Sequence, residues 1–486
     1  MKPIFSLLSS DLVNQIIEEA FQLLMDPGIK VQHQEARDLL VGAGANLDEE
    51  QQIVRIPESV ARETLDTVPR QFILYDQAEN KAVQYGGDAV HFDPGSSGVN
   101  VLDPETLEHR PAVSEDLIKV IKIAEGLPQY DAQSTALVCS EIPKEIGDLY
   151  RLYLVLLYSR KPVVTGAFRA QNTQTMIEML AICSGGRKAL AAKPTAIFDV
   201  CPTPPLIWSE FGAQNLIELA RAEVPAQIVS MPLAGVAAPV TLLGSVVQQA
   251  AECISGMAIH QLARSGSPIV WGGAPAIMDM RQGTTPMGAV ETALIDAAYA
   301  QVGKSFGFPT HAYLGASDAK IVDYQAGMES STTALIGALA GINMISGPGM
   351  LDFLSCVSPE KLVMDAEAIA MVKRAVEGIR VQTDPLAVGM YEGIDFKGEF
   401  LKQRLTGELF QKEQHLPSPV IDRGSIRTWE SAGRTDTFQR ARSRCQELLG
   451  IYQRPALPEE QERELTKLVS GLAGRAGLDH IPTFER

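Results

Sequence analysis

The sequence predicts an α/β protein: a (β/α)8 TIM barrel with an N-terminal α+β cap and a C-terminal helical extension. Between residues 88 and 380, eight short apolar runs alternate with long helical patterns. Buried parallel strands give such runs, and a helix normally connects each strand to the next. A doubly wound open sheet is the structural alternative. That fold normally shows a G-x-G-x-x-G loop after its first strand, and none follows the first run here.

The N-terminal cap is expected to span residues 1–87. Ser10 can cap a first helix, and the apolar spacing predicts a second helix at residues 34–43. A third helix should lie between two short strands, at residues 53–56 and 72–75. This part of the chain contains no chemical motif, so we expect a structural role for it.

The barrel is expected at residues 88–380, in which every apolar run is followed by a helical segment. The eight expected strands are residues 89–93, 133–139, 162–168, 195–201, 226–231, 268–273, 309–314 and 342–347. The eight expected helices are residues 114–126, 145–158, 173–183, 210–223, 242–264, 288–306, 324–340 and 359–378. This arrangement fits a barrel of about 250 residues with insertions.

The C-terminal extension, residues 381–486, is more polar than the barrel and contains four prolines between residues 417 and 458. Helical patterns occur at residues 435–449 and 458–473. We expect this extension to wrap the barrel or to form an oligomer contact, and we expect the protein to be a homo-oligomer. It is not expected to be a catalytic domain.

The charge, the apolar runs and the Cys and His spacing argue against several classes of function. The net charge is −17 with no basic cluster, which argues against nucleic-acid binding. No apolar run reaches the roughly 18 residues that span a bilayer, and the N-terminus lacks a signal-peptide pattern. A cytoplasmic protein is therefore expected. The six cysteines form no C-x-x-C pair and the seven histidines no H-x-H or H-E-x-x-H motif, so no metal site is expected, although distant Cys and His side chains can still converge on zinc.

Functional residues in such a barrel lie on the loops that follow the carboxyl ends of the strands. Aromatic residues make up 6% of the chain, yet nearly every one of these loops carries an aromatic residue or a methionine. Aromatic faces around a cavity favour a cation, above all a quaternary ammonium. The residues expected to bind substrate are Phe92, Ser96, Phe168, Phe198, Asp199, Trp271, Arg281, Tyr313, Asp318, Lys320, Met350 and Phe353.

Each of these candidates has a structural alternative. Half of the aromatic residues could face the outer helices as ordinary core. The carboxylates could cap the helices that follow them. His311, inside an expected strand, is more typical of a core histidine than of a catalytic base. No catalytic residue is identified.

Several separated motifs occur in an order that resembles the trimethylamine methyltransferase family. They are residues 26–31 (DPGIKV), 92–95 (FDPG), 101–103 (VLD), 110–112 (RPA), 278–281 (MDMR), 317–327 (SDAKIVDYQAG) and 347–351 (GPGML). A tail pattern follows at residues 422–433. The resemblance covers about residues 10–470. The segment that follows Phe400 departs from it, because many relatives have a histidine-containing segment in the corresponding place.

The resemblance implies an enzyme that moves a methyl group from an amine to the cobalt of a separate corrinoid protein. Trimethylamine-specific members carry pyrrolysine, whereas this sequence contains only standard residues. It therefore resembles members that demethylate quaternary amines such as glycine betaine, proline betaine or carnitine in anaerobic, methanogenesis-related one-carbon metabolism. The chain has no cobalamin-binding D-x-H-x-x-G motif, so we expect the corrinoid to arrive on a partner protein and no cofactor to be bound here.

Two other classes of function stay open. One is a different TIM-barrel enzyme, such as a zinc-dependent methyltransferase or a hydrolase. The other is a protein that binds a betaine without catalysis.

Overall fold

The computed structural model describes residues 3–393, 396, 400–478 and 481–482. Its centre is an eight-stranded parallel sheet with the order β6-β18-β17-β15-β13-β11-β10-β9. The strands are β6 (His91–Asp93), β9 (Gln133–Ser134), β10 (Val163–Thr165), β11 (Ala196–Val200), β13 (Ala226–Ile228), β15 (Ile269–Gly273), β17 (Thr310–Ala312) and β18 (Met344–Ser346). Each of the eight predicted runs contains one of them, which confirms the predicted barrel strands.

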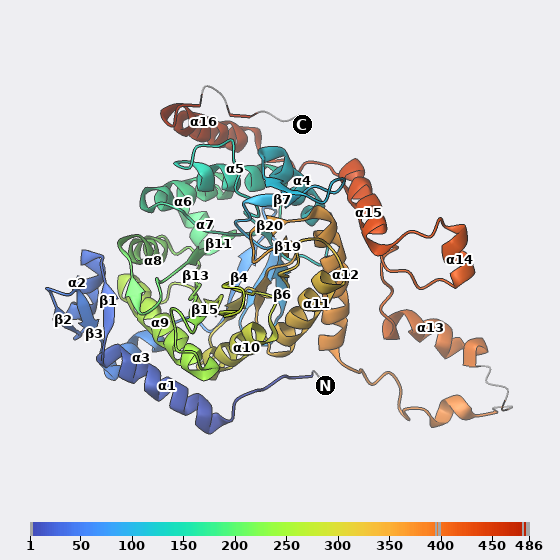
Figure 1. Cartoon of the computed structure of the whole chain (residues 1–486), viewed down its shortest axis with the longest axis horizontal. Coiled ribbons are helices and arrows are strands. Elements are labelled where there is room, and N and C mark those ends of the chain that lie inside the picture. The colour runs from blue at the N-terminus through green and yellow to red at the C-terminus, as the bar shows by residue number, and fades with distance from the viewer. Residues whose placement is uncertain (1–2, 394–395, 397–399, 479–480, 483–486) are drawn as a thin grey trace.

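The ring of strands is nearly closed between β6 and β9. The Asp131 amide donates to the Phe92 carbonyl (2.8 Å), and the Gly98 amide donates to the Ala136 carbonyl (2.9 Å). A parallel bridge also joins Gly98 to Leu137. In Figure 1 the strands lie at the centre and the helices surround them, as a (β/α)8 barrel requires.

The eight predicted helices are also confirmed. They are α4 (Ser114–Glu125), α5 (Gly147–Tyr158), α6 (Ala170–Ser184), α8 (Glu210–Ala222), α9 (Leu242–Ala263), α10 (Val290–Ser305), α11 (Tyr324–Leu339) and α12 (Pro359–Glu377). A short helix, α7 (Arg187–Ala192), was not predicted and follows the Gly185–Gly186 turn. Among the described residues, α9 alone is long and apolar enough to cross a membrane, and 83% of its most apolar window is buried inside the protein.

A β-hairpin fills the end of the barrel where the strands begin. Its strands are β4 (Phe72–Tyr75) and β5 (Lys81–Tyr85), and its Leu74, Val83 and Tyr85 side chains form one buried cluster with Val164 and Ile197 of the barrel strands. The hairpin therefore closes this end of the barrel.

The cap does not fold apart from the barrel. It contains α1 (Ser10–Met25), β1 (Ile29–Val31), α2 (Gln34–Gly42), β2 (Asn46–Asp48), β3 (Ile53–Arg55) and α3 (Glu58–Asp66). Strand β1 pairs in parallel with β12 (Ile207–Trp208), which belongs to the loop after β11. The predicted boundary at residue 87 stays a prediction, and contacts of this kind cross it.

Short sheets lie at the opposite end of the barrel, where the strands finish. One has the order β19-β20-β7-β8 and the other pairs β14 with β16. Their strands are β7 (Asn100–Leu102), β8 (His109–Pro111), β14 (Leu233–Ala234), β16 (Ala276–Ile277), β19 (Met350–Leu351) and β20 (Cys356–Val357). The loop from β19 to β20 has three consecutive residues with positive φ, at Asp352, Phe353 and Leu354.

The tail returns to the barrel after a detour. Helices α15 (Thr437–Ile451) and α16 (Glu459–Arg475) match the two predicted helices, and in Figure 1 they lie beside α12 and beside α5 and α6. The unpredicted elements η1 (Val388–Tyr391), η2 (Phe400–Lys402) and α13 (Arg404–Glu413) belong to a segment, residues 379–418, that we call the arm. No described residue of the arm is buried. Helix α14 (Ile426–Ser431) follows it.

Candidate active site

The alternation of side chains along the strands places a polar group inside the barrel. Its members lie toward the carboxyl ends of their strands and are connected by hydrogen bonds across the interior. They are Asp93, Asp199, Gln227, His311, Tyr313 and Ser346. Buried polar groups are retained when they are hydrogen-bonded or serve chemistry, so this group is the first candidate for the active site.

Asp199 is the most distinctive member of the group. Gln227 Nε2 donates to its Oδ1 (2.5 Å), and the Tyr313 hydroxyl donates to its Oδ2 (2.8 Å). Burial raises the pKa of Asp199 to about 6, against the opposing effects of these hydrogen bonds and of the Arg151 charge. Among the described residues it has no cationic partner within ion-pair distance, and the residue is only half-buried. Above pH 6 it is therefore an accessible carboxylate without a counter-charge.

A second chain of hydrogen bonds runs from Asp93 through Ser346 to His311. The Ser346 hydroxyl donates to Asp93, and the His311 Nε2 lies 3.1 Å from Ser346 Oγ. Serine stands between the histidine and the carboxylate, whereas a hydrolytic triad needs histidine in the middle. Burial also lowers the pKa of His311 to about 3, so the ring is neutral. The hydrolase alternative gains no support from this chain.

Arg151, in the first turns of α5, was not predicted. It is 1% exposed, and its Nη1 donates to the Thr135 carbonyl (2.9 Å) and to Ser97 Oγ (3.1 Å). Its guanidinium lies 4.3 Å from the centre of the Phe168 ring. A single cation in the otherwise apolar stretch Leu149–Tyr158 is the sequence feature that could have identified it.

Three of the predicted aromatic residues lie on the outer side of the barrel strands, away from the interior polar group. Trp271 packs on Phe306 and Phe308, and its Nε1 donates to the Tyr299 carbonyl of α10. Phe198 lies between the inward-facing Ile197 and Asp199.

Phe92 also faces outward. Lys373 of α12 lies 5.8 Å from its ring centre. Successive residues of a strand point to opposite faces, which explains why neighbours in sequence separate in this way. Phe168 and Tyr313, in contrast, lie at the mouth and inside the barrel.

The charged loop residues serve local structure. Arg281 pairs with Asp279 (2.9 Å) and is exposed, and the two Asp318 carboxylate oxygens accept the Met287 and Gly288 amides before α10. Lys320 pairs with Asp352 (3.1 Å) and lies 3.9 Å from the Phe353 ring centre.

The two remaining candidates have packing contacts at the mouth. Met350 is fully buried against Gly95. The Ser96 hydroxyl donates to the Thr135 carbonyl (3.3 Å), which is also an acceptor for Arg151. Of the twelve predicted residues, Asp199, Tyr313, Phe168 and Ser96 therefore lie around the interior polar group and Arg151.

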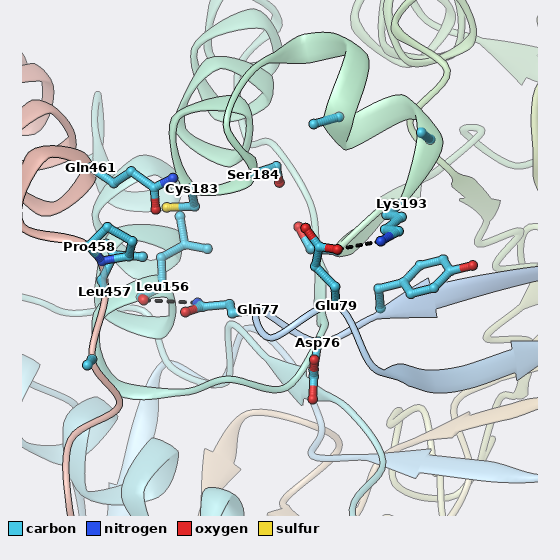
Figure 2. Close-up of a pocket in the computed structure, with 15 residues that line it drawn as sticks. Asp76, Gln77, Glu79, Leu156, Cys183, Ser184, Lys193, Leu457, Pro458 and Gln461 are labelled. Atoms are coloured by element: carbon cyan, nitrogen blue, oxygen red, sulfur yellow. Dashed lines mark hydrogen bonds and ion pairs between the residues drawn. The ribbon is translucent and has the colours of Figure 1, made fainter.

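A pocket of about 360 Å³ lies elsewhere, at the end where the strands begin (Figure 2). Glu79 and Lys193 form an ion pair on one side of it, and Leu156, Cys183 and Gln461 lie on the other. The β4–β5 hairpin separates this pocket from the interior polar group. Across the described ranges, no group of three or more His, Cys, Asp or Glu side chains is placed to hold a metal ion, so the zinc alternative gains no support there.

Fold and site together define a (β/α)8-barrel enzyme with a polar group in its interior, toward the carboxyl ends of the strands. A profile of the family described as trimethylamine methyltransferase (MTTB) matches residues 1–471. The chain belongs to this family and is a methyltransferase.

Curated relatives match over nearly the whole chain. A trimethylamine methyltransferase of Desulfitobacterium hafniense is 28% identical over 94% of this chain and 92% of its own length. One from Methanosarcina thermophila is 30% identical over 92% of this chain and 93% of its own. A glycine betaine methyltransferase of Desulfitobacterium hafniense is 27% identical over 96% and 97%.

Among solved structures, the monomethylamine methyltransferase of Methanosarcina barkeri is similar in fold. It has a TM-score of 0.53 and 15% identity over 92% of this chain and 89% of that chain. At this identity the likeness concerns the fold alone, and it agrees with the barrel described above.

Proposed function

We propose that this chain transfers a methyl group from a quaternary amine, glycine betaine or a related betaine, to cobalt(I) of a separate corrinoid protein. The observation that carries the proposal is the Asp199–Tyr313 pair, an accessible carboxylate beside an aromatic ring at the carboxyl ends of the strands. A quaternary ammonium cannot donate hydrogen bonds, so a negative charge and an aromatic face are the groups that recognise it.

The reaction needs little acid–base chemistry from the protein. The methyl carbon leaves the nitrogen, which keeps the bonding electron pair and departs as a neutral tertiary amine. The new bond forms from the electron pair of the acceptor, which the partner protein supplies as a co-substrate. A neutral leaving group requires no proton, which is consistent with the neutral, buried His311. The residues of this chain orient the amine and exclude water from it.

The shape of the site supports an acceptor that arrives from outside. The hairpin closes the opposite end of the barrel, and Phe168 and Met231, which follow β10 and β13, are both 43% exposed. An amine held by Asp199 would present its methyl groups toward this open end. We propose a cytoplasmic enzyme, and its net charge of −17 gives no support to a nucleic-acid partner.

The test mixes the protein with a reduced corrinoid protein and, in turn, glycine betaine, proline betaine, carnitine, choline and trimethylamine. We expect the cobalt(I) absorption spectrum to convert to that of methyl-cobalt(III) with at least one betaine. The matched control is the Asp199→Asn protein, which keeps the shape of the side chain and removes its charge, and which should convert more slowly. Binding of a betaine without conversion would instead support the non-catalytic alternative.

A further inference from the structure

Arg151 is a buried cation that forms no ion pair with any described residue. Among the residues that the structure describes, no carboxylate lies within ion-pair distance of it, and the nearby Asp148 is engaged by the Phe168 amide and by Asn172. Burial of an unpaired charge is costly, and it lowers the pKa of Arg151 to about 10, which still leaves the side chain charged at neutral pH. Such a residue needs either a structural partner or a ligand.

The free edge of the guanidinium has a defined geometry. Nη1 is occupied by the Thr135 carbonyl and by Ser97, whereas Nε and Nη2 have no acceptor in the described part of the chain. The Nε–Nη2 edge of an arginine is a planar pair of donors that matches the two oxygens of a carboxylate. An anion with two coplanar oxygens therefore matches this edge, which is buried and has no acceptor among the described residues.

Arg151 and Asp199 are also neighbours of opposite charge that do not pair. The charge of Arg151 lowers the pKa of Asp199, yet within the described part of the chain the Asp199 carboxylate accepts only from Gln227 and Tyr313. Neither group has an ion-pair partner among the described residues, and a ligand between them would supply one to each. A ligand with one positive and one negative end would satisfy both groups at once.

We infer that the site is built for a zwitterion, in which the Nε–Nη2 edge of Arg151 binds the substrate's carboxylate while Asp199 and Tyr313 face its ammonium group. This inference rests on the proposed function. It adds a residue that distinguishes betaines, which carry a carboxylate, from quaternary amines without one, such as choline. Phe168 covers the guanidinium, and its exposed ring must turn aside for the carboxylate to enter. Exposed side chains change rotamer within about nanoseconds, so this movement is no barrier to binding.

The experiment measures dissociation constants by calorimetry for glycine betaine and choline, which share a trimethylammonium group and differ in the carboxylate. Wild-type protein should bind glycine betaine more tightly. The Arg151→Gln protein should lose about 10- to 150-fold in affinity for glycine betaine, as expected for charge-assisted hydrogen bonds, and should keep its affinity for choline. Arg151→Lys keeps the positive charge but lacks the planar pair of donors. Its affinity for glycine betaine should therefore lie between those of the wild-type and Arg151→Gln proteins.

Two further variants make the result specific. Arg169→Gln is the matched control, since Arg169 lies next to Phe168 but is exposed and paired with Glu145, and it should leave both affinities unchanged. Arg281→Gln tests one of the two cationic residues that the sequence predicted to bind substrate. Loss of glycine betaine binding in Arg281→Gln but not in Arg151→Gln would overturn the inference.

The outcomes separate the inference from the proposed function. If wild-type protein binds no quaternary amine, the proposed function fails. If it binds glycine betaine and choline equally, only the inference fails. Should Arg151→Gln fail to fold, as judged by its circular dichroism melting curve, the wild-type preference and the Arg151→Lys protein still decide the question.

Discussion

Asp199 has a charge that changes within an ordinary experimental pH range. Its pKa is raised to about 6 by burial, so the fraction ionised rises about tenfold between pH 5 and pH 7. If the carboxylate faces the ammonium group, affinity for a quaternary amine should rise by about the same factor as the pH increases. The ammonium itself does not titrate, so the protein is the source of any such change.

The measurement is calorimetric binding of choline between pH 5 and pH 8. The Asp199→Asn protein should bind more weakly above pH 6, by between about 1 and 4 kcal/mol for a charge pair of this kind, and its affinity should not vary with pH. A wild-type profile without an inflection near pH 6 would contradict this role of Asp199.

Single residues also show the limit of what the sequence predicts. In a strand buried on both faces most residues are apolar, so no regular alternation of polar and apolar residues tells which side points inward. Phe198 and Asp199 were both expected in the cavity, and the structure separates them. Arg151 was not predicted for a different reason, because it lies on a helix and functional residues are expected on the loops after the strands.

The strands and helices themselves were predicted well because their patterns are long and regular. Eight apolar runs with helices between them define a parallel barrel with little ambiguity. The pairing of β1 with β12 was not predictable, because it joins short segments about 180 positions apart through contacts that only the folded barrel creates.

The packing of α10 on β15 can be tested with two helical glycines. A Cβ at Gly303 would lie 2.6 Å from Trp271 Cδ1, whereas one at Gly327 of α11 would meet nothing within 4 Å. Gly303→Ala should therefore destabilise the protein, by about 1–3 kcal/mol for overpacking, and lower its melting temperature. Gly327→Ala should raise it through helix propensity, by about 0.5–1 kcal/mol.

Both variants should keep their affinity for choline, because Trp271 faces away from the interior. A Gly303→Ala protein with unchanged stability but weaker ligand binding would place the indole in the cavity after all.

At the scale of the whole molecule, the arm is the least compact part of the chain. Apolar side chains along it are exposed in the single chain, among them Ile379, Leu386 and Leu401. Exposed apolar surface of this extent is typical of an interaction site. We expect the arm to be covered in a homo-oligomer, so that the double variant Leu386→Asp/Leu401→Asp dissociates.

Light scattering would measure the molar mass, which should fall to that of one chain, 52.5 kDa. Val41→Asp, which places a carboxylate on the exposed side of α2 in the cap, should leave the mass unchanged. Wild-type protein that is already monomeric would show that the expected homo-oligomer is wrong.

The pairing of β6 with β18 also has a consequence for how the chain is made. Asp93 and Ser346 are 253 positions apart, yet they lie on neighbouring strands. At about 5–20 residues per second, a ribosome needs roughly 13–50 s to add that stretch. Throughout this time β6 has an unpaired edge, and the hairpin that fills the barrel has no complete barrel to fill. The first barrel strand made is thus among the last to be protected, and a nascent chain released before residue 344 would present that edge to its neighbours.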